Sequence, residues 1–230
     1  MPAVTYRKTM AVRFRFDLSP QDALDLLASF YQFEVQNRYC EIELDEYTEN
    51  NLVELAHFIT SKEPKFGLMF CGTVGNGKTT MMKAFRSCVQ YLDSCNHFIF
   101  MDKDDSNYRF HPEMRIVDVR EIVQAAKNDN QMYSKLKKYQ MLGIDDLGKE
   151  PAEILDYGNP LSPVVELIEY RYEQQLFTII TTNLVGKEVR SKYGDRIADR
   201  FNEMLKVIVF KNKTYRQAEV SSEFKTDKNS

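Results

Sequence analysis

The sequence lacks any long apolar run, any Cys-x-x-Cys pair and any repeated or low-complexity stretch. A membrane-spanning helix needs about 20 apolar residues in succession, and residues 1–20 intersperse basic residues where a signal peptide would have its apolar core. These absences exclude the membrane and secreted classes, so we expect a cytoplasmic protein. In a reducing compartment disulfides do not persist, and we therefore expect the cysteines to be packing residues: Cys40, Cys71, Cys88 and Cys95.

Strong net charge is also absent. The chain has 230 residues, with 31 Lys and Arg against 34 Asp and Glu, for a formal net charge of −3. This length suits one globular domain with a small appendage, and the balance of charge excludes a histone-like basic coat. The charges are nevertheless segregated, because residues 1–15 are basic, residues 41–54 are acidic and residues 186–216 are mainly basic. Such segments create local fields or are simply solvated faces.

The pattern of apolar residues predicts two N-terminal helices followed by alternating strands and helices. Ser19 and Pro20 have the residue types of a helix start, and a second helix over residues 48–60 ends before Pro64. We expect strands at residues 67–71, 114–118, 140–145, 177–182 and 206–210, with helices at 78–92, 119–127 and 163–176. Strands separated by helices of this length are typical of a parallel sheet with crossover helices. Residues 94–112 are ambiguous, and 97–101 could form a strand of its own or half of a hairpin.

The strongest functional signal is a phosphate-binding loop. Residues 72–79 match G-x-x-x-x-G-K-[ST], directly after a predicted strand and at the start of a predicted helix. In such a loop, glycines let backbone N–H groups converge on phosphate oxygens, the lysine reaches the β- and γ-phosphates, and the hydroxyl binds Mg²⁺. A tight strand-to-helix turn without a ligand is the simpler alternative. The predicted nucleotide-binding residues are Gly72, Thr73, Val74, Gly75, Asn76, Gly77, Lys78, Thr79 and Thr80.

Polar residues at the ends of two later strands complete this prediction. Asp145 ends a buried strand and is expected to hold Mg²⁺ together with Thr79, while Asp146 would act as base or position the water. Asn183 follows the strand at 177–182 and could hydrogen-bond the attacking water or the γ-phosphate. Each of these residues is also common in turns and caps without any catalytic role.

A pair of arginines lies on a predicted short helix over residues 195–204. Arg196 and Arg200 are four residues apart and so share a face. One interpretation is surface pairing, of Arg196 with Asp199 and of Arg200 with Glu203. The other is an arginine finger presented to the γ-phosphate in a neighbouring subunit, which is worth about 10³–10⁵ in rate.

As a set, these residues resemble the DnaC/IstB-like branch of the AAA+ ATPases, a family of helicase loaders and transposition helpers. The resemblance covers roughly residues 48–216 and rests on segments 72–79, 142–148, 180–183, 194–201 and 213–216. It implies an α/β P-loop NTPase fold of the AAA+ type, with a parallel five-stranded sheet of order 5-1-4-3-2 and ATP hydrolysis across subunit interfaces. It further implies that Asn183 is a sensor, that Arg200 is the finger with Arg196 beside it, and that Arg216 is a second nucleotide sensor.

The chain departs from the family pattern at several points. Asp146 stands where many AAA+ proteins have Glu, so turnover is expected to be slow, or the chain is a nucleotide-gated binding module with little turnover. We expect no helical lid after residue 210. The predicted organisation is an N-terminal helical appendage at 1–47, which is a candidate partner-binding segment, an ATPase core at 48–218 and a polar tail at 219–230.

The expected function is therefore that of a Mg²⁺-dependent ATPase, an accessory of DNA replication of the helicase-loader type. It would assemble as a homo-oligomer with ATP and act on single-stranded DNA with a replicative helicase. Candidate DNA contacts precede the Asp145 strand, and are Lys135, Lys137, Lys138 and Tyr139. The alternatives are a transposition helper of the same family, which would work with a transposase, and a P-loop kinase of a small metabolite.

Overall fold

The fold is built on a parallel five-stranded sheet. The computed structural model describes residues 14–39, 45–61, 65–100, 112–151, 154–156, 159–212 and 214–215. Its main strands are β2 (Gly67–Gly72), β4 (Met114–Asp118), β5 (Met141–Leu147), β8 (Phe177–Thr182) and β9 (Leu205–Phe210), in the order β4-β5-β8-β2-β9. All four neighbouring pairs are parallel. Because β2 is the first of these strands along the chain and β9 the last, this is the predicted 5-1-4-3-2 order, which is confirmed.

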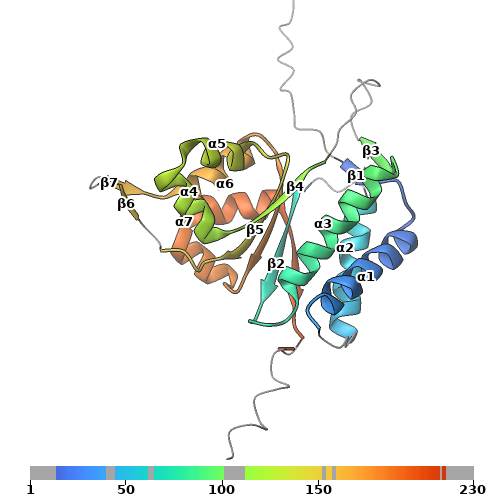
Figure 1. Ribbon diagram of the computed structural model, residues 1–230. Helices are drawn as coiled ribbons and strands as arrows, with labels where there is room; N and C mark the ends of the chain where they lie inside the picture. Colours follow the sequence, from blue (N-terminus) through green and yellow to red (C-terminus); the bar gives the residue numbers. More distant parts are fainter. Residues whose placement is uncertain are drawn as a thin grey trace, which may run out of the picture.

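Helices cover both faces of the sheet (Figure 1). On one face lie α1 (Pro20–Gln36), α2 (Glu46–Thr60) and α3 (Lys78–Ser94), which share one hydrophobic cluster with β2. On the other lie α4 (Val119–Asn128), α5 (Asn130–Lys138), α6 (Pro163–Glu173) and α7 (Gly186–Met204), which form a second cluster. The sheet is therefore the middle of three layers, as continuous apolar strands require.

The helix starts follow from local chemistry. At α1 the Ser19 hydroxyl accepts a hydrogen bond from the Asp22 amide at 3.1 Å, and Pro20 occupies the first turn. At α4 the Asp118 carboxylate accepts from the Arg120 amide, and the Glu121 carboxylate accepts from the Asp118 amide, which makes a capping box. Both starts are where the residue types predict them.

Helix α1 packs against α2 and α3. Ala23, Leu27 and Tyr31 are buried on one stripe of α1 and belong to the same cluster as the core of α3. The Ser87 hydroxyl on α3 also donates to the Glu34 carboxylate on α1 at 3.2 Å. The described part of the N-terminal appendage therefore packs against the core of the fold, while the boundary near residue 47 stays a prediction.

Four short strands lie outside the main sheet. Strand β1 (Phe14–Phe16) pairs antiparallel with β3 (Phe98–Phe100), and β6 (Ile154–Asp156) pairs antiparallel with β7 (Asn159–Leu161). The segment 97–101, for which the sequence left two alternatives, contains β3, and the partner of β3 comes from the N-terminal end of the described chain. The main sheet continues with β4 instead.

Two further observations concern the segment after β9 and the question of a membrane-spanning helix. In the part of the chain that the structure describes, which reaches Tyr215, no helix follows β9, in line with the expected lack of a lid. The described helices include none that is both long and apolar enough to cross a membrane.

Candidate nucleotide site

The phosphate loop connects β2 to α3. Gly75 and Gly77 have φ values of 84° and 92°, in the region that favours glycine. A Cβ atom at Gly77 would lie 2.7 Å from the hydroxyl oxygen of Tyr31 on α1. The loop conformation and the close approach of α1 therefore both require glycine at this position.

Lys78, the first residue of α3, is folded back into the loop. Its ammonium group donates to the carbonyl oxygens of Gly72 at 2.9 Å and Thr73 at 2.6 Å, and to Oδ1 of Asn76 at 3.0 Å. The residue is 6% exposed. Burial lowers the pKa of Lys78 from 10.5 to about 8, and the charge of Asp146 only partly offsets this. The ammonium of Lys78 therefore has three oxygen acceptors within the loop, and it would have to leave them to pair with an anionic ligand.

Asp145 lies directly against the phosphate loop. Its Oδ1 accepts hydrogen bonds from the hydroxyl of Thr79 at 2.8 Å and from that of Thr181 at 2.5 Å. Asp145 is also the residue of β5 that faces Asp118 of β4 in the parallel register. The carboxylate of β5 and the hydroxyl of α3 thus meet at the carboxyl edge of the sheet, where ligands of open α/β sheets bind.

Asp146 sits in a break in the ladder between β5 and β8. Its φ is 60°, and the register of the two strands shifts between Ile144 and Leu147. Its amide donates to the Thr181 hydroxyl at 2.9 Å, and its Oδ2 forms an ion pair with the ammonium of Lys149 at 2.5 Å. Because of this backbone conformation, Asp146 does not continue the regular strand geometry of Asp145.

Asn183 follows β8 at the same edge. Thr182 is paired in register with Cys71 of β2 and with Leu147 of β5. Asn183 therefore comes after a strand that lies between the strand before the phosphate loop and the strand that carries the two acids. It is partly buried. The structure thus brings Lys78, Thr79, both acids and Asn183 to one edge, as predicted.

Other predicted loop residues differ in exposure. Val74 is 54% exposed at the loop, whereas Asn76 and Thr80 are buried. Thr73 is exposed, and its carbonyl accepts from Lys78. Arg216, the predicted second sensor, lies outside the described residues.

The two predicted arginines are held by α6. Arg196 forms an ion pair with Glu169 at 3.1 Å, and Arg200 forms pairs with Glu169 at 2.7 Å and Glu173 at 3.6 Å. Arg200 also stacks over the Tyr172 ring, 5.0 Å from its centroid. The side chain of Arg196 is 69% exposed and that of Arg200 is 12% exposed. The two arginines therefore share one carboxylate, yet only Arg196 is open to solvent.

The pairings that sequence spacing favoured within this helix are wrong. Asp199 pairs with Arg190 instead of Arg196, and Glu203 accepts from the Tyr172 hydroxyl instead of pairing with Arg200. The reason is that α6 packs against α7 and supplies carboxylates closer to the arginines than those one turn along their own helix.

A buried polar cluster on the outer side of the loop was missed by sequence reasoning. The Asn212 amide donates to the Asn76 carbonyl at 3.0 Å, to the Tyr215 hydroxyl at 2.8 Å and to the Thr48 hydroxyl at 3.2 Å. The Tyr215 amide donates to the Gly75 carbonyl at 3.0 Å. The segment after β9 and the start of α2 thus brace the phosphate loop. No local pattern signals this, because the partners are more than 130 residues apart.

The donor set fits a magnesium ion. Mg²⁺ prefers oxygen ligands and usually keeps several waters, so one or two protein oxygens together with substrate phosphates suffice. The Thr79 hydroxyl and the Asp145 carboxylate supply such oxygens and are already in contact. These two residues are the ones that would hold the ion.

The order of the strands, the loop between β2 and α3 and the acids at the end of β5 define the chain as a P-loop NTPase fold of the AAA+ type. Comparison with solved structures agrees. The crystal structure of the DnaC helicase loader is similar with a TM-score of 0.53 and 21% identity, over 74% of this chain and 94% of that chain. The crystal structure of DnaI is similar with a TM-score of 0.55 and 19% identity, over 86% of this chain and 95% of that chain.

At these identities the likeness concerns the fold, and it confirms at that level the resemblance indicated by the sequence motifs. No model of a known protein family matches the sequence, and no curated protein does.

Proposed function

We propose that the chain is an ATP-binding and ATP-hydrolysing accessory of DNA replication, of the helicase-loader type. The observation that carries the proposal is the contact of Thr79 on the phosphate loop with Asp145 on β5, 2.8 Å apart. A glycine-rich turn with no ligand has no need of a carboxylate beside the hydroxyl at the helix start. In an ATPase these are the two groups that hold Mg²⁺ next to the phosphates.

The residues at the sheet edge divide the chemistry between them. Lys78 leaves its loop acceptors and pairs with the β- and γ-phosphates, while Thr79 and Asp145 hold the ion. When bound, Mg²⁺ would supply positive charge next to the phosphate oxygens, where negative charge develops during transfer. Asp146 orients the attacking water, and Asn183 donates to that water or to the γ-phosphate.

The arginines act on the nucleotide of a neighbouring subunit. Arg200 is the finger and Arg196 lies beside it. Their ion pairs with Glu169 and Glu173 hold both guanidinium groups beside α6, and a phosphate of the neighbouring subunit's nucleotide would take the place of these carboxylates. A guanidinium that is already oriented loses less conformational entropy when it meets an anion.

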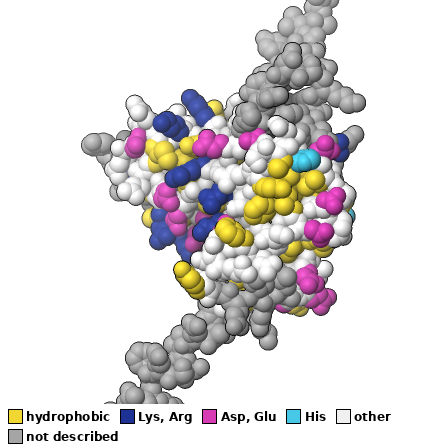
Figure 2. Space-filling view, turned by 45° about the vertical axis from the view of Figure 1, so that its right-hand side comes forward, with side chains coloured by type: hydrophobic (Ala, Val, Ile, Leu, Met, Phe, Trp, Pro, Cys, Tyr) yellow, Lys and Arg dark blue, Asp and Glu magenta, His cyan; other side chains and the backbone are white. Residues whose placement is uncertain are grey.

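The proposed oligomer binds single-stranded DNA. Lys135 and Lys138 are exposed on α5, whereas Lys137 pairs with Glu166 at 2.6 Å and lies over the rings of Tyr133 and Tyr170. Of the predicted contacts, Lys135 and Lys138 are therefore the ones open to a phosphate backbone. Figure 2 shows most of the basic side chains of this view gathered on its left-hand half.

A replicative helicase is the proposed protein partner, and the described part of the N-terminal appendage is the proposed contact. The likeness in fold to the DnaC helicase loader supports the kind of partner. Phe33 on α1 is 53% exposed and Tyr91 on α3 is 49% exposed. Figure 2 shows apolar side chains gathered on the right-hand half of the view, where α1 and α3 come forward, with acidic side chains around them. Such a surface suits a protein partner.

Assembly in response to nucleotide tests the proposal. Light scattering of the full chain, with and without a non-hydrolysable ATP analogue and Mg²⁺, should show one subunit without the analogue and a multisubunit assembly with it. A chain that binds the analogue and stays a single subunit at every concentration would favour the kinase alternative. Co-purification with a hexameric helicase, and not with a transposase, then identifies the partner.

A further inference from the structure

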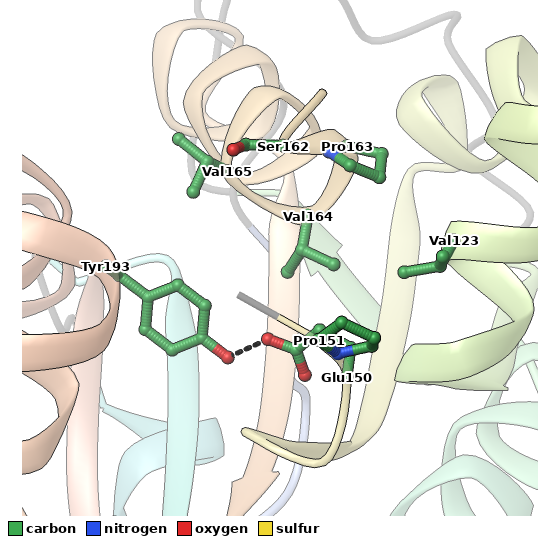
Figure 3. Close-up of a pocket in the computed structure, with 8 residues that line it drawn as sticks. All are labelled: Val123, Glu150, Pro151, Ser162, Pro163, Val164, Val165 and Tyr193. Atoms are coloured by element: carbon green, nitrogen blue, oxygen red, sulfur yellow. Dashed lines mark hydrogen bonds between the residues drawn. The ribbon is translucent and has the colours of Figure 1, made fainter. Parts of the chain in front are cut away.

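The loop that follows β5 is tied to α7 through a buried glutamate. Glu150 is 4% exposed. Its Oε2 accepts from the Gly148 amide at 2.9 Å, and its Oε1 accepts from the hydroxyl of Tyr193 on α7. Figure 3 shows this contact, with the Tyr193 ring reaching from α7 to the Glu150 carboxylate beside Pro151. The contact forms one wall of a small pocket that α4 and α6 complete.

A lysine completes the tie. The ammonium of Lys192 donates to the carbonyl oxygens of Gly148 and of Glu150, the latter at 2.6 Å, and lies 3.7 Å from the Glu150 carboxylate. Burial, followed by the contact with Glu150, raises the pKa of Tyr193, so its hydroxyl keeps its proton and remains a donor. The glutamate is thus a buried charge with three partners. Removing one partner of such a network is costly, because the others are left without compensation.

The tie joins two functional segments by a short path. On one side, Asp146 lies in the last part of β5, four residues before Glu150, at the nucleotide site. On the other, Tyr193 is followed by Gly194, whose φ of 82° interrupts α7, and beyond that kink the helix carries Arg196 and Arg200. A Cβ atom at Gly194 would meet nothing within 4 Å. The second half of α7 therefore begins at a backbone kink, and a side chain at the kink itself would meet no neighbour.

We infer that Glu150 is a positioning residue that couples occupation of a subunit's own nucleotide site to the orientation of the arginines on its α7. The inference rests on the proposed function and adds a connection within one subunit. The ammonium of Lys149 is 2.5 Å from the Asp146 carboxylate, and its charge is close enough to Lys78 to lower the pKa of that lysine. A phosphate beside Lys78 therefore competes with Asp146 for Lys149. Displacement of Lys149 moves the loop at Gly148, and Glu150 transmits that movement to Tyr193 and the kink.

A ligand shifts such an equilibrium only if it interacts differently with the two arrangements. Here the two arrangements differ at Lys149, because its ammonium group cannot pair with Asp146 and with a phosphate at the same time. The second half of α7 responds only while Glu150 and Tyr193 are joined. Without the hydrogen bond between Tyr193 and Glu150 the nucleotide still binds, but the second half of α7 no longer changes its position in response.

Amide hydrogen exchange in the full chain tests this coupling. Exchange at residues 195–204 is measured with and without a non-hydrolysable ATP analogue and Mg²⁺, at a concentration where light scattering shows single subunits. In the wild type we expect the analogue to change exchange in this segment by about fivefold or more. In Tyr193→Phe and in Glu150→Gln we expect a change of less than about 1.5-fold, with analogue affinity within about twofold of the wild type.

Tyr133→Phe is the matched control. Tyr133 is also a buried phenol, and its hydroxyl donates to the carbonyl of Pro163 on α6 at 2.8 Å, not to the loop after β5. It should respond like the wild type. The coupling alone is overturned if the analogue changes exchange at residues 195–204 as much in both coupling variants as in the wild type. It is also overturned if the wild type binds the analogue and its exchange in this segment does not change. Loss of analogue binding in both variants would also overturn it, because the tie would then support the site itself. No binding by the wild type would overturn the proposed function as well.

Discussion

At the scale of single residues, the account depends on a buried lysine that must be charged to bind phosphate. Lys78 has a pKa of about 8 in the ligand-free fold, mainly because it is buried. Negative phosphate next to it favours the protonated form and raises that pKa again. Above about pH 8 ATP binding must therefore take up a proton, and affinity must fall as the pH rises.

Calorimetry in two buffers of different ionisation enthalpy measures this uptake. At about pH 8.5 we expect wild-type chains to take up more protons per ATP than Lys78→Arg chains do, by roughly half a proton at least. The reason is that the guanidinium of the variant stays charged at this pH. At about pH 6.5 the two proteins should show the same proton balance, because Lys78 is already protonated. Equal proton balance at both pH values would contradict the role of Lys78.

Asp145 gives a second prediction at this scale. Asp145→Asn keeps an oxygen that accepts from Thr79 and Thr181, so the fold should be retained, but it removes the charge that holds Mg²⁺. We expect turnover to fall by about 100-fold or more, with the Mg²⁺ concentration for half-maximal activity raised. Steady-state ATPase assays over a Mg²⁺ titration measure both. Turnover within threefold of the wild type at every Mg²⁺ concentration would exclude the metal role.

The residues that the sequence predicted at the site belong to contiguous motifs, and this is why they could be found. Glu150, Lys192 and Tyr193 could not, because their importance depends on a contact between loop and helix across 42 or more residues. Arg196 and Arg200 were recognised by their spacing, but their carboxylate partners on α6 depend on helix packing and not on sequence distance.

At the scale of elements, the connection of α5, α6 and β8 depends on one arginine. Arg171 on α6 is fully buried, and burial lowers its pKa to about 9. It donates to the carbonyl oxygens of Tyr139 at 2.7 Å and Phe177 at 2.6 Å, and to the Thr178 hydroxyl at 2.9 Å. A positive charge at the carboxyl end of α5 also complements the helix dipole.

Replacing this arginine should destabilise the whole core. Arg171→Met fills similar space but leaves several buried acceptors without a donor, so we expect the free energy of unfolding to fall by about 3 kcal/mol. Urea unfolding measures the change. Arg190→Met is the control, since Arg190 is an exposed side chain paired with Asp195 and Asp199, and its midpoint should stay near that of the wild type. An unchanged midpoint for Arg171→Met would contradict the bracing role.

Most main elements could be predicted because each carries its own periodic pattern. The five strands and α3, α4 and α6 appear within a few residues of their predicted bounds. Helix α5 was not predicted, because only Asp129 separates it from α4. The helix with the arginines is the second half of α7. Because Gly194 interrupts the helical pattern, the sequence did not predict that the helix begins at Gly186. Strands β1 and β3 each have three residues and depend on each other, so neither has a sufficient signal alone.

At the scale of the whole molecule, the strand order implied by the resemblance to the DnaC/IstB-like family was right, and it is one of the few arrangements that crossover helices allow a parallel sheet. The charge of −3 gives no information about partners, since most basic side chains in the view of Figure 2 gather on its left-hand half, while acidic ones are spread over both halves. The proposed binding of single-stranded DNA follows from exposed lysines on α5 and not from the total charge.

Salt dependence tests this interaction. With a non-hydrolysable ATP analogue present, affinity for labelled single-stranded DNA should fall linearly on a log–log plot against salt, because binding releases counterions. The double variant Lys135→Gln/Lys138→Gln should lower the slope by about 1–2. Lys187→Gln, which removes an exposed charge at the start of α7, should leave it unchanged. Fluorescence anisotropy gives the slopes, and a flat wild-type plot would remove DNA from the account.

The central claim is that nucleotide is hydrolysed at a site shared between two subunits. The direct test mixes Lys78→Ala chains, which keep their arginines, with Arg196→Ala/Arg200→Ala chains, which keep their phosphate loop. Neither protein alone should hydrolyse ATP at a significant rate, and random mixing in equal amounts should restore about a quarter of the wild-type rate per chain. Failure to recover activity at any ratio, with both variants folded and assembling, would contradict the claim.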